Sequence, residues 1–183
     1  MDIEKKVEEL VTPIILNLGF EVYDVIYEKQ GQDNVLTIFI DKEGGINIED
    51  CELVNDNITD LLDEKDLIKD QYMLSVSSPG IERLIRKDKH IEANINKKIK
   101  INLYKKLELN KDIGKEFECT LISFDDEFLT IKIDNDQISN NNKKKNKKKD
   151  KEENDNLEAS IIVMIKKSDV SKMQTVFDWN SIK

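Results

Sequence analysis

Ser75–His90, SVSSPGIERLIRKDKH, is the segment of this sequence best equipped to recognise another molecule. Both arginines of the chain lie here, although the chain has 29 Lys and Arg in total. A guanidinium group presents five donors in one plane, which suits bidentate binding of phosphate or carboxylate. The segment therefore supplies the candidate partner- or RNA-binding residues: Arg83, Arg86, Lys87, Lys89, Ser77 and Ser78.

The same segment has a purely structural interpretation. The arginines could lock two domains together through ion pairs with Glu82, Asp88 or an acid further forward, and a hinge can combine that role with outside contact. Ser77 and Ser78 precede Pro79 and Gly80, where hydroxyls commonly stabilise a turn. The sequence leaves both interpretations open.

Catalytic interpretations find little support. The two cysteines, Cys51 and Cys119, are 68 positions apart without a CxxC pair, which excludes a disulfide scaffold and argues against structural zinc. A thiol enzyme would need Cys51 with His90, the only histidine, yet Cys51 falls on an apolar helical stripe where packing is the usual role. No phosphate-binding loop, dinucleotide fingerprint, HExxH or GxSxG motif is present. We predict no catalytic residue, metal or cofactor.

Charge is distributed unevenly along the chain. The net charge is −9, but residues 1–90 hold 21 acids against 10 Lys and Arg, and the tract 134–158 holds seven of each. An acidic front half repels phosphate at long range and suits a basic protein, so nucleic acid contact should depend on local basic clusters or the rear half.

The first ninety residues predict an α-β-β-α-β domain. Apolar residues spaced three and four apart predict a helix from Ile3 to Leu18, with a kink or break at Pro13, and a second helix capped by Asn47. Strands are predicted over 20–27, 35–40 and 72–77, with the second helix crossing over between two parallel strands. We assign this domain to residues 1–86.

The remainder predicts a small, curved antiparallel barrel. Strands are expected over 98–103, 116–124, 128–133 and 159–165, and 168–183 should cover the open end. We assign 87–96 to a linker and 97–183 to the barrel domain, with a low-complexity insertion at 134–158. Its six lysines in positions 143–149 could bind RNA phosphates, or the tract could be a tolerated insertion without function.

Four runs of the front domain closely resemble the RimP family of bacterial ribosome maturation factors. They are LGFEVYDV (18–25), LTIFIDKEGGINIEDCELV (36–54), LLDEKDLI (61–68) and YMLSVSSPGIERLI (72–85); the ending VFDW at 176–179 is a looser likeness. The VSSPG turn with GGI and EDC is the specific part.

The resemblance implies an α+β protein of two domains, the second an Sm-like, SH3-type barrel. It also implies a noncatalytic factor that matures the small ribosomal subunit by transiently binding ribosomal protein or rRNA, without a cofactor. The family usually has Leu-Asp-Arg-Pro-Leu after the glycine, whereas this chain has Ile81–Ile85, IERLI. Losing the proline frees a backbone angle, so the pose of Arg83 is less constrained.

Two rivals follow from the residues: a free-standing RNA-binding regulator built on the Sm-like barrel, and a thiol-dependent enzyme. Against the regulator, exposed stacking aromatics are few, with Tyr104 and Phe124 the candidates. No apolar run is long enough for a membrane helix, and the first residues lack the apolar core of a signal peptide. We therefore expect a cytoplasmic monomer whose partner is the immature small subunit, with no membrane or small-molecule substrate.

Overall fold

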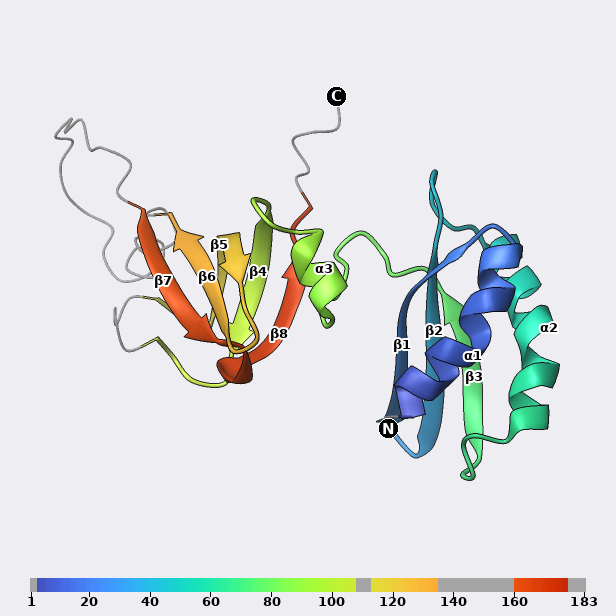
Figure 1. Ribbon diagram of the computed structural model, residues 1–183. Helices are drawn as coiled ribbons and strands as arrows, with labels where there is room; N and C mark the ends of the chain where they lie inside the picture. Colours follow the sequence, from blue (N-terminus) through green and yellow to red (C-terminus); the bar gives the residue numbers. More distant parts are fainter. Residues whose placement is uncertain (1–2, 108–112, 135–159, 178–183) are drawn as a thin grey trace, which may run out of the picture. The chain divides into compact units, whose positions relative to one another are not determined.

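The computed structural model describes residues 3–107, 113–134 and 160–177, and the chain divides into two compact units (Figure 1). We call Met1–Gly80 the front unit and Ile81–Lys183 the rear unit. Each unit has its own hydrophobic core. Residues 81–96 lie in the rear unit. The division into a domain 1–86, a linker 87–96 and a barrel domain 97–183 stays a prediction.

The front unit has the predicted α-β-β-α-β order. Its elements are α1 (Ile3–Asn17), β1 (Glu21–Gln30), β2 (Asp33–Asp41), α2 (Ile48–Lys65) and β3 (Tyr72–Ser77). The sheet has the order β1-β2-β3, with β1 antiparallel and β3 parallel to the central β2. The parallel pair confirms that α2 is a crossover connection, as a parallel pair of strands requires.

Both helices cover one face of this sheet. Alternate residues of β2 point to that face, as a strand's period of two dictates, and they share a core with apolar residues of both helices. The fully buried members are Val7, Val11, Ile15, Val25, Leu36, Ile38, Ile40, Val54 and Ile58. The helices therefore owe their positions to a stripe of apolar residues spaced three and four apart.

Helix α1 runs without a break through Pro13, so the predicted division into two pieces is wrong. Pro13 lacks the N–H that would bond to the Glu9 carbonyl, and both residues are exposed, so the lost hydrogen bond costs little. Thr12 does not cap a second helix; its hydroxyl donates to the Glu8 carbonyl at 2.6 Å, one turn back.

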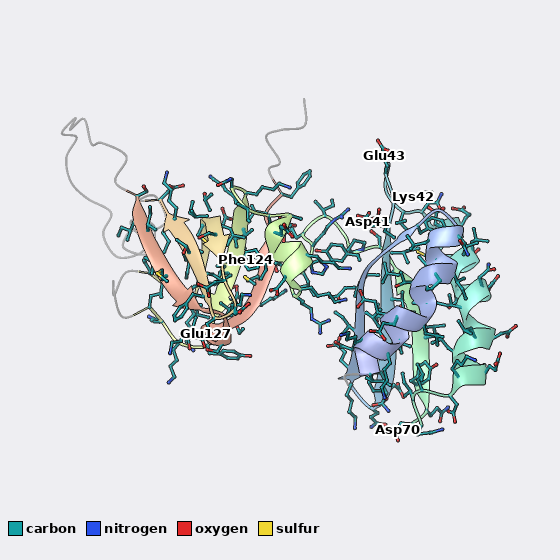
Figure 2. The ribbon with its side chains drawn as sticks, in the orientation of Figure 1. Asp41, Lys42, Glu43, Asp70, Phe124 and Glu127 are labelled. Atoms are coloured by element: carbon teal, nitrogen blue, oxygen red, sulfur yellow. The ribbon has the colours of Figure 1, made fainter. Side chains whose placement is uncertain are left out.

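The GGI and EDC runs build the start of α2. Asn47 accepts the Asp50 N–H at 2.8 Å, and the Asp50 carboxylate accepts the Asn47 N–H at 2.9 Å, which completes a capping box. Lys42 adds an ion pair to Asp50 at 2.8 Å; Lys42 lies beside Asp41 and Glu43 in Figure 2. Positive φ values of 86° and 88° explain the glycines at 44 and 45, because this region disfavours side chains.

This capping box should make the front unit sensitive to acid. The hydrogen bond from the Asn47 backbone, followed by that from Lys42, lowers the pKa of Asp50 below its usual value. A carboxylate with a lowered folded-state pKa stabilises the fold above its unfolded-state pKa of about 4, and the stabilisation disappears as the pH falls through the folded value. Asp50→Asn should lower the unfolding midpoint at pH 7, and the difference from wild type should vanish towards pH 2.

Urea unfolding of both proteins between pH 2 and 7 measures this difference. Glu52→Gln, an exposed position on the same helix, is the control and should show no such convergence. A wild-type advantage over Asp50→Asn that is the same at pH 2 and pH 7 would show that the carboxylate's charge plays no part in the cap.

The rear unit contains a short helix and one antiparallel sheet. The elements are α3 (Asp88–Glu92), β4 (Lys98–Leu103), β5 (Glu116–Phe124), β6 (Phe128–Ile133), β7 (Ile161–Lys166), the 3₁₀ turn η1 (Lys167–Asp169) and β8 (Val170–Thr175). The sheet order is β7-β6-β5-β4-β8. Strands β4, β5 and β6 have the predicted bounds, and Asp125 caps the β5–β6 turn by accepting the N–H groups of Glu127 and Phe128.

The sheet is strongly curved, but a closed barrel is not confirmed. The two edge strands, β7 and β8, are joined by only three residues, so their adjoining ends must lie close together (Figure 1). No backbone pairing links β7 to β8, both of which the structure describes. Residues 170–175 were expected to cover a barrel opening; instead they form β8, which pairs with β4.

Two predictions fall outside the described residues. One is most of the insertion at 134–158, which belongs to the range 135–159. The other is the end of the segment 168–183 that was expected to cover the barrel opening, which belongs to the range 178–183. Within the described ranges, no helix combines the length and apolar character needed to cross a membrane.

Candidate partner-binding segment

The candidate serines lie at the end of the front unit. Ser77 is the last residue of β3, and its hydroxyl donates to the Ser78 carbonyl at 3.3 Å. The Ser78 hydroxyl accepts the Gly80 N–H at 3.2 Å, and Gly80 has a φ of 76°. This is the geometry of hydroxyls that stabilise a turn.

The candidate cations all belong to the rear unit, because the chain from Ile81 to Ile85 adds itself to the free edge of β8. The Arg83 N–H donates to the Thr175 hydroxyl at 2.8 Å, and the Thr175 N–H donates to the Arg83 carbonyl at 2.9 Å. The Ile85 N–H donates to the Met173 carbonyl at 2.9 Å, and Leu84 forms an antiparallel bridge with Gln174. The segment therefore covers an edge strand, which would otherwise offer unpaired backbone groups.

Helix α3 positions the last two cations. His90 is 4% exposed, and its Nδ1 atom accepts the backbone N–H groups of Arg86 at 3.3 Å and Lys87 at 3.4 Å. These bonds hold the chain that carries Arg86, Lys87 and Lys89 against the core. Arg86 and Lys89 are exposed, whereas Arg83 and Lys87 are half-buried.

The two acids suggested as partners for the arginines also have contacts within the rear unit. Glu82 accepts the Gln174 side-chain amide at 2.7 Å, and Asp88 pairs with Lys167 at 2.9 Å. Lys167 also lies 4.8 Å from the centre of the Phe124 ring; Figure 2 labels Phe124. Phe124, one of the two aromatic candidates for stacking on RNA bases, thus already contacts a cation of its own chain. The other candidate, Tyr104, is 63% exposed.

The thiols occupy ordinary structural positions. Cys51 is half-buried against the front core, and burial followed by the charge of Asp50 raises its pKa. Cys119 is buried in the rear core, where burial raises its pKa to about 12. A raised pKa lowers the fraction of the thiolate that a nucleophile needs, and the Nδ1 atom of His90, the histidine considered as a partner of Cys51, accepts a hydrogen bond within the rear unit. Among the described residues, no group of His, Cys, Asp and Glu is arranged to hold a metal ion.

The structure adds a feature that the sequence analysis did not predict. A cavity of about 490 Å³ lies between α2 and β3, lined by Thr59, Leu62, Asp63, Lys69, Asp70, Gln71, Tyr72 and Leu74. The acids of α2 have no evident role in the sequence alone. Their position beside an aromatic residue of β3 depends on the packing of the two elements.

The fold thus defines a protein of two units, a small α/β domain with a parallel crossover followed by a curved antiparallel β domain. The family model of the RimP N-terminal domain matches residues 10–82. This match confirms the resemblance to the RimP family of ribosome maturation factors: the front unit is a RimP N-terminal domain.

Proposed function

We propose that this protein is a noncatalytic assembly factor of the small ribosomal subunit, which binds an immature subunit transiently and leaves as assembly proceeds. The observation that carries the proposal is the match of residues 10–82 to the RimP N-terminal domain. The resemblance, not the geometry, supplies the small subunit as the partner.

The rear unit fits the Sm-like domain that this proposal includes. A short helix is followed by five antiparallel strands whose edge strands are joined by η1. The Tyr104 N–H donates to the Asp169 carbonyl at 3.0 Å, which ties the end of β4 to η1 and supports strong curvature.

The charges of the two units support binding to both components of a ribosome precursor. Residues 1–80 contain 19 acids and six lysines, a surplus that attracts a basic ribosomal protein. Arg83, Arg86, Lys87 and Lys89 lie on the segment that begins the rear unit, and they are the residues we propose to contact rRNA phosphate or a carboxylate. Ser77 and Ser78 shape the turn that precedes them.

Reversal of both arginines tests the site. In an affinity purification from cells lacking the factor, the tagged wild-type protein should enrich small-subunit precursors, and Arg83→Glu with Arg86→Glu should reduce that enrichment at least about tenfold. Losing two charge-assisted hydrogen bonds costs roughly 1.5 kcal/mol or more each, and each 1.4 kcal/mol is a factor of ten.

Lys105→Glu with Lys106→Glu is the matched control, because it makes the same charge change at exposed residues elsewhere in the rear unit. Thermal unfolding of both variants shows whether they remain folded. If the arginine variant is folded and still enriches small-subunit precursors at the wild-type level, the arginines have a structural role only. Absence of small-subunit precursors from the wild-type purification would defeat the proposed function itself.

The RNA-binding regulator makes a different prediction, namely tight binding of naked single-stranded RNA by stacking. Phe124, one of its two aromatic candidates, is half-buried beneath Lys167. A titration with an oligonucleotide at two salt concentrations separates the two proposals, because phosphate contacts alone weaken steeply with salt.

A further inference from the structure

The cavity between α2 and β3 lies beside an edge strand. β3 pairs with β2 on one side only, and α2 runs next to it in the front unit (Figure 1). A groove between an edge strand and a helix can accept an extended segment as an added strand, because the outer backbone groups of the edge strand are available for pairing. The position of this site beside an edge strand therefore suits an extended polypeptide.

The groove combines an apolar wall with an acidic rim. The side chains of Leu62, Tyr72 and Leu74 also contact the front core, so they provide a fixed surface. The ring of Tyr72 packs edge-on against Tyr27, with 6.5 Å between ring centres. An aromatic face held in this way can bind a cation, and the binding strengthens when water is excluded.

The rim carries negative charge that is not neutralised locally. Lys69 also lines the groove and pairs with Asp66, and Lys65 pairs with Glu64. Neither Asp63 nor Asp70 forms an ion pair with any residue that the structure describes. Figure 2 shows Asp70 at the end of the front unit where α2 connects to β3. Burial, and after it the charges of Asp63 and Asp66, raise the pKa of Tyr72. The charged residues that line the groove, Asp63, Asp70 and Lys69, together carry a net charge of −1.

The sequence around the groove is also acidic. Residues 48–70 contain nine Asp and Glu and only two Lys. Such a surface repels the phosphates of RNA and also repels a second copy of itself, whereas it attracts Lys and Arg. Charge complementarity thus selects a basic polypeptide as the occupant.

We propose that the groove between α2 and β3 binds an extended, Lys- or Arg-rich segment of a partner protein as a strand added to β3. A cationic side chain of that segment lies against Tyr72 between Asp63 and Asp70. The identity of the partner as a ribosomal protein rests on the proposed function, but the groove itself does not.

A peptide titration tests the groove. The probe is a synthetic peptide in which lysine and valine alternate, added to the ¹⁵N-labelled full chain and followed by NMR. We expect shifts at Gln71–Ser77 and the facing turn of α2, with slower hydrogen exchange at amides of β3. A peptide with glutamate in place of lysine should cause no such shifts. Equal binding of both peptides, or shifts confined to other parts of the chain, would overturn the proposal.

Two variants separate the rim from general acidity. Asp63→Asn with Asp70→Asn should weaken binding of the lysine peptide about fivefold, because each charge pair lost at an exposed site makes a small contribution to affinity. Glu52→Gln with Glu64→Gln is the matched control, because it removes the same number of charges from exposed positions of α2 that do not line the groove. An equal loss in both would reduce the effect to net charge and exclude a specific site.

The peptide titration and the affinity purification together distinguish failure of the groove from failure of the proposed function. If the lysine peptide binds the groove but the wild-type protein does not enrich small-subunit precursors, the proposed function fails and the groove stands. If the wild type enriches precursors and the peptide does not bind, the groove fails and the proposed function stands.

Discussion

A fragment that begins at Ile81 should fold on its own, whereas a fragment that begins at Lys97 should not. The residues between these two starts supply Ile85 and Ile91, which are 2% and 3% exposed in the rear core, and His90, which is 4% exposed. Removing a buried isoleucine costs about 2–5 kcal/mol. Two such losses approach the whole stability of a typical domain, about 5–15 kcal/mol.

The longer fragment also retains the strand pairing that covers β8. The shorter one exposes the edge of β8 where Thr175 and Met173 pair with Arg83 and Ile85, and exposed edges promote association between chains. We expect dispersed amide signals and a cooperative urea transition for 81–183. For 97–183 we expect poor dispersion and aggregation. Equal unfolding midpoints for the two fragments would restore 87–96 to the role of a simple linker.

The second large effect should be confined to one unit. Ile38 is fully buried in the central strand of the front sheet, between Val25 on β1 and Val76 on β3. Ile38→Ala should cost about 2–5 kcal/mol, through lost burial and the cavity left behind. Since every 1.4 kcal/mol is tenfold, the most protected front amides should exchange roughly 30-fold to several thousandfold faster.

Amide hydrogen exchange of the full chain, followed by NMR, measures both units in one experiment. The rear amides should retain their wild-type protection in Ile38→Ala because the two cores share no residue. Ile101→Ala, at a fully buried position of β4, is the matched variant and should show the reverse pattern. A parallel loss of protection in both units after either substitution would mean that the two units unfold as one.

Much of the fold was predictable because its signals are local. The bounds of β3, β4, β5 and β6 follow from alternating apolar residues and from turn residues beside them. The start of α2 follows from Asn47, which caps the helix through a residue only three positions away. Such signals require no knowledge of the rest of the chain.

The errors occurred where distant residues decide the structure. β8, VSKMQT, has little apolar alternation, and its strand conformation depends on β4 on one side and on Arg83 and Ile85 on the other. Thr175 is 92 positions from Arg83, so no local sequence pattern predicts that the two residues pair. Helix α3 has only five residues, too few to show a helical spacing of apolar residues. Its first turn is held by buried His90, which accepts the Lys87 N–H.

The candidate site likewise has properties that can be predicted from local sequence and properties that depend on distant residues. The sequence by itself determined the residue types: two arginines in one segment, hydroxyls at a Pro-Gly turn, an acidic front half and the likeness to RimP. Only the tertiary structure decided that the cations start the rear unit and that Asp63, Asp70 and Tyr72 surround one cavity. The physical reason is that charge and turn preference reside in individual residues, whereas an edge that needs covering or a groove beside a strand exists only after separate elements have packed.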